Sequence, residues 1–422
     1  MSHLLADVSS ASPVRTVAEA GTYIARVCFK HGPPRLTGIE LEWLLADPAE
    51  PDRRPDLATL RIALGPHAPC TLTPDSPAAP LPAGGTVTVE PGGQVEISSI
   101  PARSCAELVA AMRTDVAALT ALLAPTGFVL ADAACDPARA PHRLLRTPRY
   151  DAMAAGFERI SPAGATMMCA TAATQLCVDL GDRDEAATRW QAAHLLGPVL
   201  LAAFANSPTD DRLSGRMAAW WELDPARTCP PGSLEPGDYV ERVLDTEVLA
   251  RRRLGGDWLP ERPMTLRGWI ESGDTVLTSD LDLHLSMLFP PVRPQGYLEL
   301  RYLDAQPAGE WIAPLALVAA LFGSRGTLAR ATEVCRPAAD RWWQATSIGL
   351  DDPVLAGCAR QLAELATAAL PGAGLDDADS ALVQAILERR LREGICPARD
   401  SRPVGAPPPA AVAAGQEGGA RP

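Results

Sequence analysis

The 422-residue sequence predicts an α+β fold, in which antiparallel strands and amphipathic helices share one core. Two stretches predict it. Residues Thr86–Ser98 alternate apolar and polar side chains on both sides of Pro91-Gly92-Gly93, which is typical of a β-hairpin. Residues Ser104–Leu123 carry apolar side chains at helical spacing behind a serine that can cap the first turn, which indicates an amphipathic helix.

A second predicted strand, Gly38–Trp43, is acidic. Glu40 and Glu42 are two residues apart, so in a strand they share one face at roughly 7 Å from each other. In the hairpin, Glu90 and Glu96 lie together on the polar side if the apolar faces of its strands match. Four carboxylates that point to one place repel unless cations lie between them, and Mg²⁺ prefers hard oxygen ligands. The alternative is an ordinary solvated acidic face.

The remaining elements follow from periodicity and from Pro- and Gly-rich breaks. Apolar patterns predict helices, further strands and a basic loop, and one segment fits a helix or a strand equally well. In that segment Thr171, Gln175 and Asp179 share a face in either case. The predicted helices are Val17–Cys28, Ala186–Ala205 and Tyr239–Arg252; the strands are Gly127–Ala131, Gly296–Tyr302 and, from partial alternation, Val276–Leu288; the loop is Pro141–Tyr150; the ambiguous segment is Met167–Leu180.

The chain is predicted to form one domain with a flexible segment at each terminus. Residues 1–15 are expected to be a flexible N-terminus, residues 16–396 a single domain, and the Pro-, Ala- and Gly-rich residues 397–422 a disordered tail. No internal repeat and no signal for an oligomeric state occurs in the sequence.

Charge and composition exclude several classes of protein. A net charge of −13 argues against non-specific nucleic-acid binding, which needs a basic surface. The N-terminus lacks the pattern of a secretory signal, and the longest apolar runs are too short to span a bilayer, so a cytoplasmic protein without membrane contact is expected. The ten cysteines, with no CxxC pair, are expected to be reduced thiols.

The common phosphate-binding signatures are missing. The chain has no Walker A motif, and Lys30, its one lysine, is not placed in such a motif. Phosphate chemistry would therefore require Mg²⁺ on carboxylates together with arginine forks. Arg216 and Trp220 could clamp a substrate or form an ordinary packing pair, and His284 could be a ligand or a hydrogen-bonded core residue.

Several motifs, in the same order, resemble plant-type glutamate–cysteine ligases over about residues 35–305. Within that group the chain resembles the actinobacterial enzymes that supply γ-glutamylcysteine for ergothioneine biosynthesis. The runs E-P-G-G-Q-x-E and L-F-P-x-V-R…E-x-R are the specific signals. The matching segments are Gly38–Glu42, Val89–Ser98, Arg149–Met153, Met167–Thr171 with Gln175 and Asp179, Phe204–Pro208, Arg216–Trp220 and His284–Arg301.

This resemblance implies a curved, mostly antiparallel sheet that forms a funnel-shaped active site, flanked by helices, as in glutamine-synthetase-like carboxylate–amine ligases. It also implies an ATP-dependent reaction. The γ-carboxylate of L-glutamate attacks the γ-phosphate of ATP, and the amine of L-cysteine then displaces phosphate from γ-glutamyl phosphate. The products are γ-glutamylcysteine, ADP and phosphate, with Mg²⁺ as cofactor.

The resemblance also implies roles for individual residues. The Mg²⁺ ligands would be carboxylates with a possible histidine, arginines would hold the anions, and small or apolar side chains would line the amino-acid pocket. The implied metal ligands are Glu40, Glu42, Glu90, Glu96, Glu299 and His284; the catalytic residues are Arg301 and Glu96; the substrate-binding residues are Arg216, Trp220, Met168, Thr171, Arg149 and Gln175; Gln94 and Arg301 would contact the nucleotide.

Two alternatives to this function stay open. The first is a ligase of the same mechanism that joins glutamate to another amine. The second is a non-catalytic protein that binds a metal or an amino acid and keeps the fold.

Overall fold

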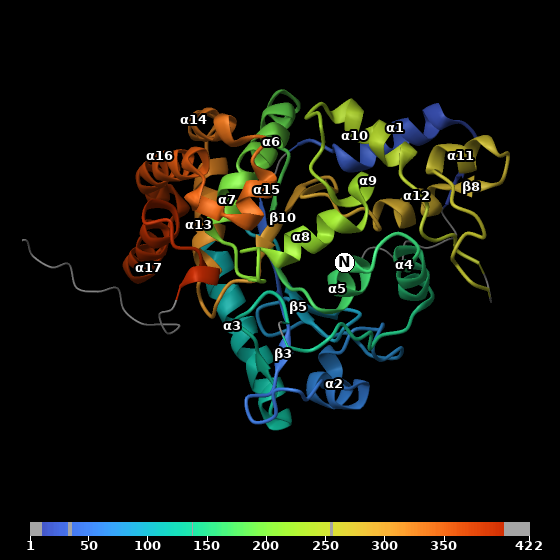
Figure 1. The fold of residues 1–422 in the computed structure, drawn as a ribbon, viewed down its shortest axis with the longest axis horizontal. Coiled ribbons are helices and arrows are strands. Elements are labelled where there is room, and N and C mark those ends of the chain that lie inside the picture. Colours follow the sequence, from blue (N-terminus) through green and yellow to red (C-terminus); the bar gives the residue numbers. More distant parts are fainter. Residues whose placement is uncertain (1–10, 33–35, 137, 254–255, 401–422) are drawn as a thin grey trace, which may run out of the picture.

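The structure has an antiparallel sheet of six strands in the order β4-β5-β2-β7-β10-β9. Its strands β5 and β10 lie near the middle of the molecule in Figure 1. The structure is a computed structural model that describes residues 11–32, 36–136, 138–253 and 256–400. Two short ribbons, β1 with β8 and β3 with β6, accompany the sheet. The strands are β1 (Pro13–Val14), β2 (Thr37–Trp43), β3 (Leu45–Ala46), β4 (Thr86–Val89), β5 (Val95–Ser98), β6 (Val129–Leu130), β7 (Ala173–Val178), β8 (Val276–Leu277), β9 (Val292–Pro294) and β10 (Leu298–Asp304).

The register of the sheet separates a polar face from an apolar one. Glu42 lies opposite Glu96, and Glu40 lies opposite Gln175, so these side chains project from the same face. The pair Leu41 and Ile97, one position along, points to the other face and is buried. The predicted matching of the hairpin strands is therefore confirmed, and the acidic residues of two separate segments share one side of the sheet.

Helices surround this sheet on several sides, and two groups of them pack tightly together (Figure 1). The C-terminal helices α13, α14, α16 and α17 pack on one another on one side, and α1 packs on α10, α11 and α12 on the other. The helices are α1 (Val17–Cys28), α2 (Leu57–Leu64), α3 (Cys105–Leu123), α4 (Pro148–Glu158), α5 (Ala163–Cys169), α6 (Arg183–Leu195), α7 (Gly197–Ala203), α8 (Gly215–Leu223), α9 (Pro225–Thr228), α10 (Pro236–Asp245), α11 (Leu266–Glu271), α12 (Thr278–Leu285), α13 (Ile312–Phe322), α14 (Arg325–Cys335), α15 (Trp342–Ser347), α16 (Pro353–Ala369) and α17 (Asp377–Leu387). The α+β class with a helix-flanked antiparallel sheet is confirmed.

Helix α3 begins as predicted, because the Ser104 side chain accepts a hydrogen bond from the backbone N–H of Glu107. By length and composition alone, the segment Cys105–Thr126 is apolar enough to cross a membrane. In the structure it is an amphipathic helix, with one face buried and the other exposed. The buried carboxylate of Asp115 accepts hydrogen bonds from the N–H groups of Ala83 and Gly85, at 2.7 and 2.8 Å, and so holds the loop before β4.

Three segments differ from the sequence prediction. Residues 278–285 form helix α12 rather than a strand, because the Asp280 side chain accepts the N–H of Leu277 at 2.9 Å and so caps a helix. The predicted helix 186–205 is two helices, α6 and α7, since Pro198 has no N–H to continue the first. The helix predicted to reach residue 252 ends at Asp245. The ambiguous segment resolves into α5 followed by β7.

The two ends of the described chain are partly structured. Pro13 and Val14 pair with Leu277 and Val276 as β1 and β8. Residues 1–10 and 401–422, which make up most of the predicted flexible ends, lie outside the described residues. All ten cysteines are free thiols, as predicted.

Candidate active site

A cavity of about 80 Å³ lies over the polar face of the sheet, and we call it the central cavity. Strands supply its acidic floor. Helices α4, α5 and α8 and the loops around them supply basic, aromatic and sulfur-containing walls. Its lining includes Glu40, Glu42, Glu90, Gln94, Glu96, Arg149, Tyr150, Met153, Met167, Met168, Thr171, Gln175, Trp220, Ser286, Phe289, Arg293 and Arg301.

The four carboxylates on the floor of the central cavity are buried close together, so their ionised forms are destabilised. Burial, followed by repulsion from Glu96 and Glu299, raises the pKa of Glu40 to about 8. Burial also raises the pKa values of Glu42, Glu90 and Glu96 to about 7 each, helped by repulsion from Glu90, Glu96 and Glu42 respectively. The site therefore stabilises its ionised carboxylates poorly by itself, and a bound cation would relieve the repulsion.

A chain of hydrogen bonds crosses the sheet beside these carboxylates. Gln175 donates to Glu42 at 2.7 Å and accepts from the guanidinium of Arg301. Arg301 also donates to Glu299, which receives a second, two-pronged contact from Arg293 at 2.7 and 3.0 Å. Burial alone would raise the pKa of Glu299, but Arg293 and Arg301 lower it to about 2. Glu299 is thus ionised and fixes both arginines in place.

The hairpin turn is fixed against the segment that joins α5 to β7. A Cβ on Gly92 would lie 2.2 Å from the carbonyl oxygen of Cys169, so only glycine fits there. Gly93 has a φ of +90°, which also favours glycine. The Gln94 side chain accepts the N–H of Gly92 at 3.0 Å and donates to the carbonyl oxygen of Thr171 at 3.0 Å. These contacts set the position of Glu90 at the edge of the central cavity.

Arginines from the sheet and from helix α4, together with aromatic rings, line the cavity beside the carboxylates. The Arg301 guanidinium lies 5.3 Å from the centroid of Trp220, whose ring packs edge-on against Phe289. The Nε atom of Arg301 is buried and has no hydrogen-bond partner among the described residues. Arg149 donates to the carbonyl oxygen of Ser286 at 2.9 Å, and its own Nε is likewise unpaired within the described chain. Both arginines thus retain donors for an anionic ligand.

Comparison with known protein families gives a match over most of the chain. The sequence profile described as glutamate–cysteine ligase family 2 (GCS2) matches residues 36–417. The chain belongs to this family.

Relatives of this GCS2 chain carry the same description. It is 34% identical over 406 residues to the glutamate–cysteine ligase EgtA of Mycobacterium tuberculosis, covering 90% of this chain and 88% of that one. It is 33% identical over 401 residues to EgtA of Mycolicibacterium smegmatis, covering 91% and 92%. The chloroplastic glutamate–cysteine ligase of Arabidopsis thaliana is 27% identical over 240 residues, covering 53% and 46%. A solved glutamate–cysteine ligase of Francisella tularensis, in complex with AMP, aligns with a TM-score of 0.49 at 13% identity, covering 88% of this chain and 84% of that one.

Most of the residues that the sequence singled out meet in the central cavity of the GCS2 chain, and three do not line it. Glu299 lies directly behind Arg301, as described above. Arg216 is fully buried beneath Trp220, 4.9 Å from its ring centroid, and donates to the carbonyl oxygen of Arg301 at 2.9 Å. Gln94 does line the cavity, but its amide is engaged by backbone groups, so its contact with a nucleotide stays a prediction.

His284 is not brought to the carboxylates. It lies on α12, fully buried, with Nε2 3.0 Å from the carbonyl oxygen of Val243. Burial, followed by the charge of Arg227, lowers its pKa to about 4. The expectation that it completes the metal site therefore does not fit this arrangement. The partial alternation that predicted a strand over Val276–Leu288 belongs, around His284, to helix α12.

Arg293, Ser286 and Phe289 also line the central cavity, although none of them was predicted to do so. Arg293 was quoted in the family motif without a role, and only the pairing of β9 with β10 places it opposite Glu299. Gln295, two residues further along, also donates to Glu299 at 3.1 Å. The alternation of Arg293 and Gln295 was the sequence pattern that could have placed both side chains on one face. Ser286 and Phe289 had none beyond membership of the same motif.

The donor set of the GCS2 chain suits a hard divalent cation, although it is not preformed. Among the described residues, no three His, Cys, Asp or Glu side chains surround a common point closely enough to hold a metal ion. The glutamate side chains would have to turn toward the ion. The raised pKa values of Glu40, Glu42, Glu90 and Glu96 nevertheless identify carboxylates that lack a cationic partner of their own, which is the condition a bound Mg²⁺ would satisfy.

Proposed function

We propose that this chain is an ATP-dependent ligase that joins the γ-carboxyl group of L-glutamate to the amine of L-cysteine. The observation that supports it most is the meeting, over one sheet face, of four carboxylates with Arg149, Arg293 and Arg301. Phosphoryl transfer between two anions needs that combination of cation-binding and anion-binding groups. Membership of glutamate–cysteine ligase family 2 and the EgtA names of its relatives support the same substrates.

The reaction has two steps with a shared intermediate. In the first, a γ-carboxylate oxygen of glutamate bonds to the γ-phosphorus of ATP, and the bond from that phosphorus to the β,γ-bridging oxygen breaks to release ADP. In the second, the cysteine amine bonds to the acyl carbon, the carbon–oxygen bond to phosphate breaks, and the amine loses a proton. The products are γ-glutamylcysteine, ADP and phosphate.

The protein contributes chiefly position and charge to these steps. Arg301 is held by Glu299 and Gln175, and its Nε has no hydrogen-bond partner among the described residues. Its charge would neutralise the phosphoryl group during transfer. Arg149 and the face of Trp220 would hold glutamate, with Met168 and Thr171 closing the pocket. Arg216 would act from behind, by fixing Trp220 and the carbonyl group of Arg301.

Glu40, Glu42, Glu90 and Glu96 would hold Mg²⁺, with Glu299 as a neighbouring charge. The cation would supply charge neutralisation for the phosphates of ATP and for the transferred group. We also propose that residues 16–396 act as one catalytic domain in the cytoplasm, and that the product serves ergothioneine biosynthesis, in line with the EgtA relatives.

The proposal is tested by measuring product and ADP together. Purified protein with Mg²⁺, ATP and glutamate should release ADP in a cysteine-dependent manner, and mass spectrometry should detect one γ-glutamylcysteine per ADP. Panels that replace cysteine with other amines identify an alternative acceptor. Glutamate binding without any amine-dependent ADP release would contradict the ligase and favour a binding protein.

A further inference from the structure

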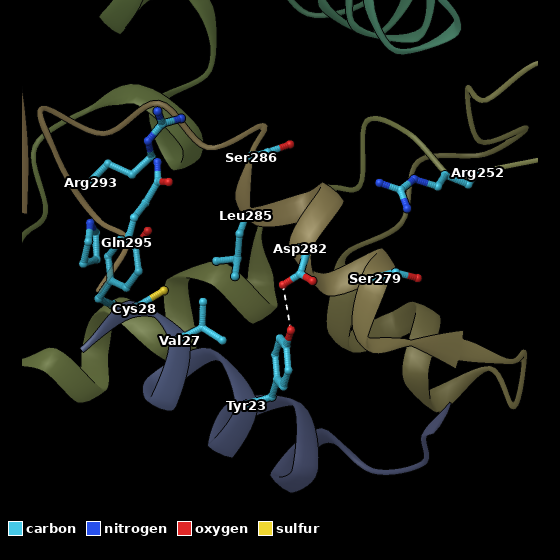
Figure 2. A pocket seen from close by; sticks show the side chains of 12 residues that line it. Tyr23, Val27, Cys28, Arg252, Ser279, Asp282, Leu285, Ser286, Arg293 and Gln295 are labelled. Carbon is cyan, nitrogen blue, oxygen red and sulfur yellow. Dashed lines mark hydrogen bonds between the residues drawn. The ribbon is translucent and has the colours of Figure 1, made fainter. Parts of the chain in front are cut away.

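A second cavity of about 270 Å³ adjoins the central cavity, and we call it the side cavity. It lies between α1, α10, α12 and β9 (Figure 2). Ser286 and Arg293 line both the side cavity and the central cavity. A small molecule in the side cavity would therefore stand directly beside the site where the acyl phosphate is proposed to form.

The side cavity carries opposite charges at separate positions. Asp282 accepts a hydrogen bond from the hydroxyl of Tyr23 at 2.8 Å, and Figure 2 shows this pair at the middle of the lining. Arg252 reaches in from the end opposite Arg293. Such a separation of one positive and one negative group matches the two charges of a free α-amino acid.

Arg252 is not held in an ion pair within the described chain, although its charge acts on the carboxyl group of Asp280. It donates no hydrogen bond there and joins no ion pair, whereas its neighbour Arg251 pairs with Asp274 at 3.0 Å and Arg253 with Glu261 at 3.7 Å. The Arg252 side chain is half-buried. A half-buried guanidinium that lines a cavity and is not already held in an ion pair is suited to bind a carboxylate ligand.

The position of Arg252 also gives the ligand a direction. Arg252 and Ser286 both line a third cavity, of about 470 Å³, which borders Glu90 and Arg149 of the central cavity. Ser286 is thus common to all three cavities. A carboxylate on Arg252 leaves the amine of the same molecule free to point past Ser286 toward the central cavity. The third cavity has a more apolar wall, with Val87, Val89 and Trp258, so the polar side cavity is the better site for a zwitterion.

We propose that the side cavity binds the acceptor amino acid and that Arg252 anchors its α-carboxylate. This inference rests on the proposed function and specifies how the chain selects a carboxylate-bearing amine. Arg252 is a specificity-determining residue in this account, because an amine without a carboxylate gains nothing from it. Asp282 attracts the ammonium group of the incoming amino acid.

The test compares cysteine with cysteamine, which is the same molecule without the carboxylate. Wild type, Arg252→Gln, Arg252→Lys and the control Arg253→Gln are assayed for amine-dependent ADP release at saturating glutamate and ATP, in a thiol-free reductant. We expect Arg252→Gln to lower kcat/KM for cysteine by roughly 10- to 100-fold, the usual value of one charge-assisted contact, and to leave cysteamine unchanged. Arg252→Lys should restore part of the loss, and Arg253→Gln should match wild type.

An equal loss for cysteine and cysteamine in Arg252→Gln, or no loss for either, would overturn the proposal. A wild type without cysteine-dependent turnover would instead contradict the proposed function. In that case calorimetric titration of cysteine into the glutamate-saturated protein still decides the inference: weaker binding to Arg252→Gln than to wild type supports it, and equal binding overturns it.

Discussion

At the residue scale, the function depends on how carboxylates are held close together. Glu299 is compensated by two arginines, and its pKa lies at about 2. Glu40 has no ion-pair partner among the described residues, and its pKa rises to about 8. Neighbouring residues of the same type thus differ in pKa because of their partners. Glu299 fixes two arginines in place, whereas the ionised form of Glu40 would need a bound cation to stabilise it.

This difference predicts a pH dependence of stability. A raised carboxyl pKa in the folded protein means that the folded state binds protons more tightly than the unfolded state, so its stabilising effect is complete below the ordinary value of 4.5 and is lost as the pH rises through about 8. In EDTA, we expect the Tm to fall between pH 5 and 8.5 by calorimetry. Glu40→Gln should flatten that fall, and Mg²⁺ should restore the Tm at the alkaline end. A Tm that is independent of pH in both proteins would contradict the assignment.

A second prediction at this scale concerns Arg301. Lysine keeps the charge but cannot bridge Gln175 and Glu299 while facing the ligand. We expect Arg301→Lys to lower kcat on the order of 100-fold, the typical cost of losing one preorganised donor, with the far-ultraviolet spectrum unchanged. Steady-state kinetics measures it, and a variant with wild-type kcat would remove Arg301 from the proposed chemistry.

At the scale of elements, the hairpin matters because its turn packs tightly against the C-terminal end of α5. Gly92→Ala would place a methyl group on the carbonyl group of Cys169. We expect a loss of about 1–3 kcal/mol in the free energy of unfolding and a matching loss of activity, because Glu90 and Gln94 move with the turn. Gly372→Ala is the matched control, since nothing lies within 4 Å of its Cβ. Urea unfolding of both variants measures this loss, and equal stabilities would contradict the close contact of Gly92 with Cys169.

The hairpin and the acidic strand could be predicted because their signal is local. Alternation alone set the faces of Thr86–Ser98, and with them the side on which Glu90 and Glu96 lie. The strand predicted for residues 276–288 was wrong because it relied on the same local signal. Leu281, Leu283 and Leu285 alternate with polar residues by coincidence inside helix α12. The contact of Arg293 with Glu299 depends on strand pairing. Its contribution to the cavity also requires the helices that cover the sheet, which no local pattern encodes.

At the scale of the whole molecule, the C-terminal helices are tied back to the sheet by buried charge. Arg390, which is 2% exposed, pairs with Asp400 at 2.8 Å and with Glu310, which follows β10 and precedes α13. We expect Arg390→Met to lower the free energy of unfolding by about 3–5 kcal/mol without changing KM values, because it removes the buried ion pair with Glu310 and leaves Asp400 with Arg389 alone. None of these residues lines the central cavity. Arg392→Met, which removes an exposed pair with Glu388, should change little. Similar thermal unfolding of the two variants would contradict this role.

The central claim concerns the acidic face itself, and Glu96 tests it most directly. Glu96 is 3% exposed, lies opposite Glu42, and accepts a hydrogen bond from Thr88 at 2.7 Å. The decisive measurement is the Mg²⁺ dependence of cysteine-dependent ADP release by Glu96→Gln, beside the exposed control Glu364→Gln. A loss of activity by at least on the order of 100-fold, with a wild-type Tm and a higher Mg²⁺ requirement, is predicted. Wild-type activity and Mg²⁺ dependence in Glu96→Gln would contradict the claim.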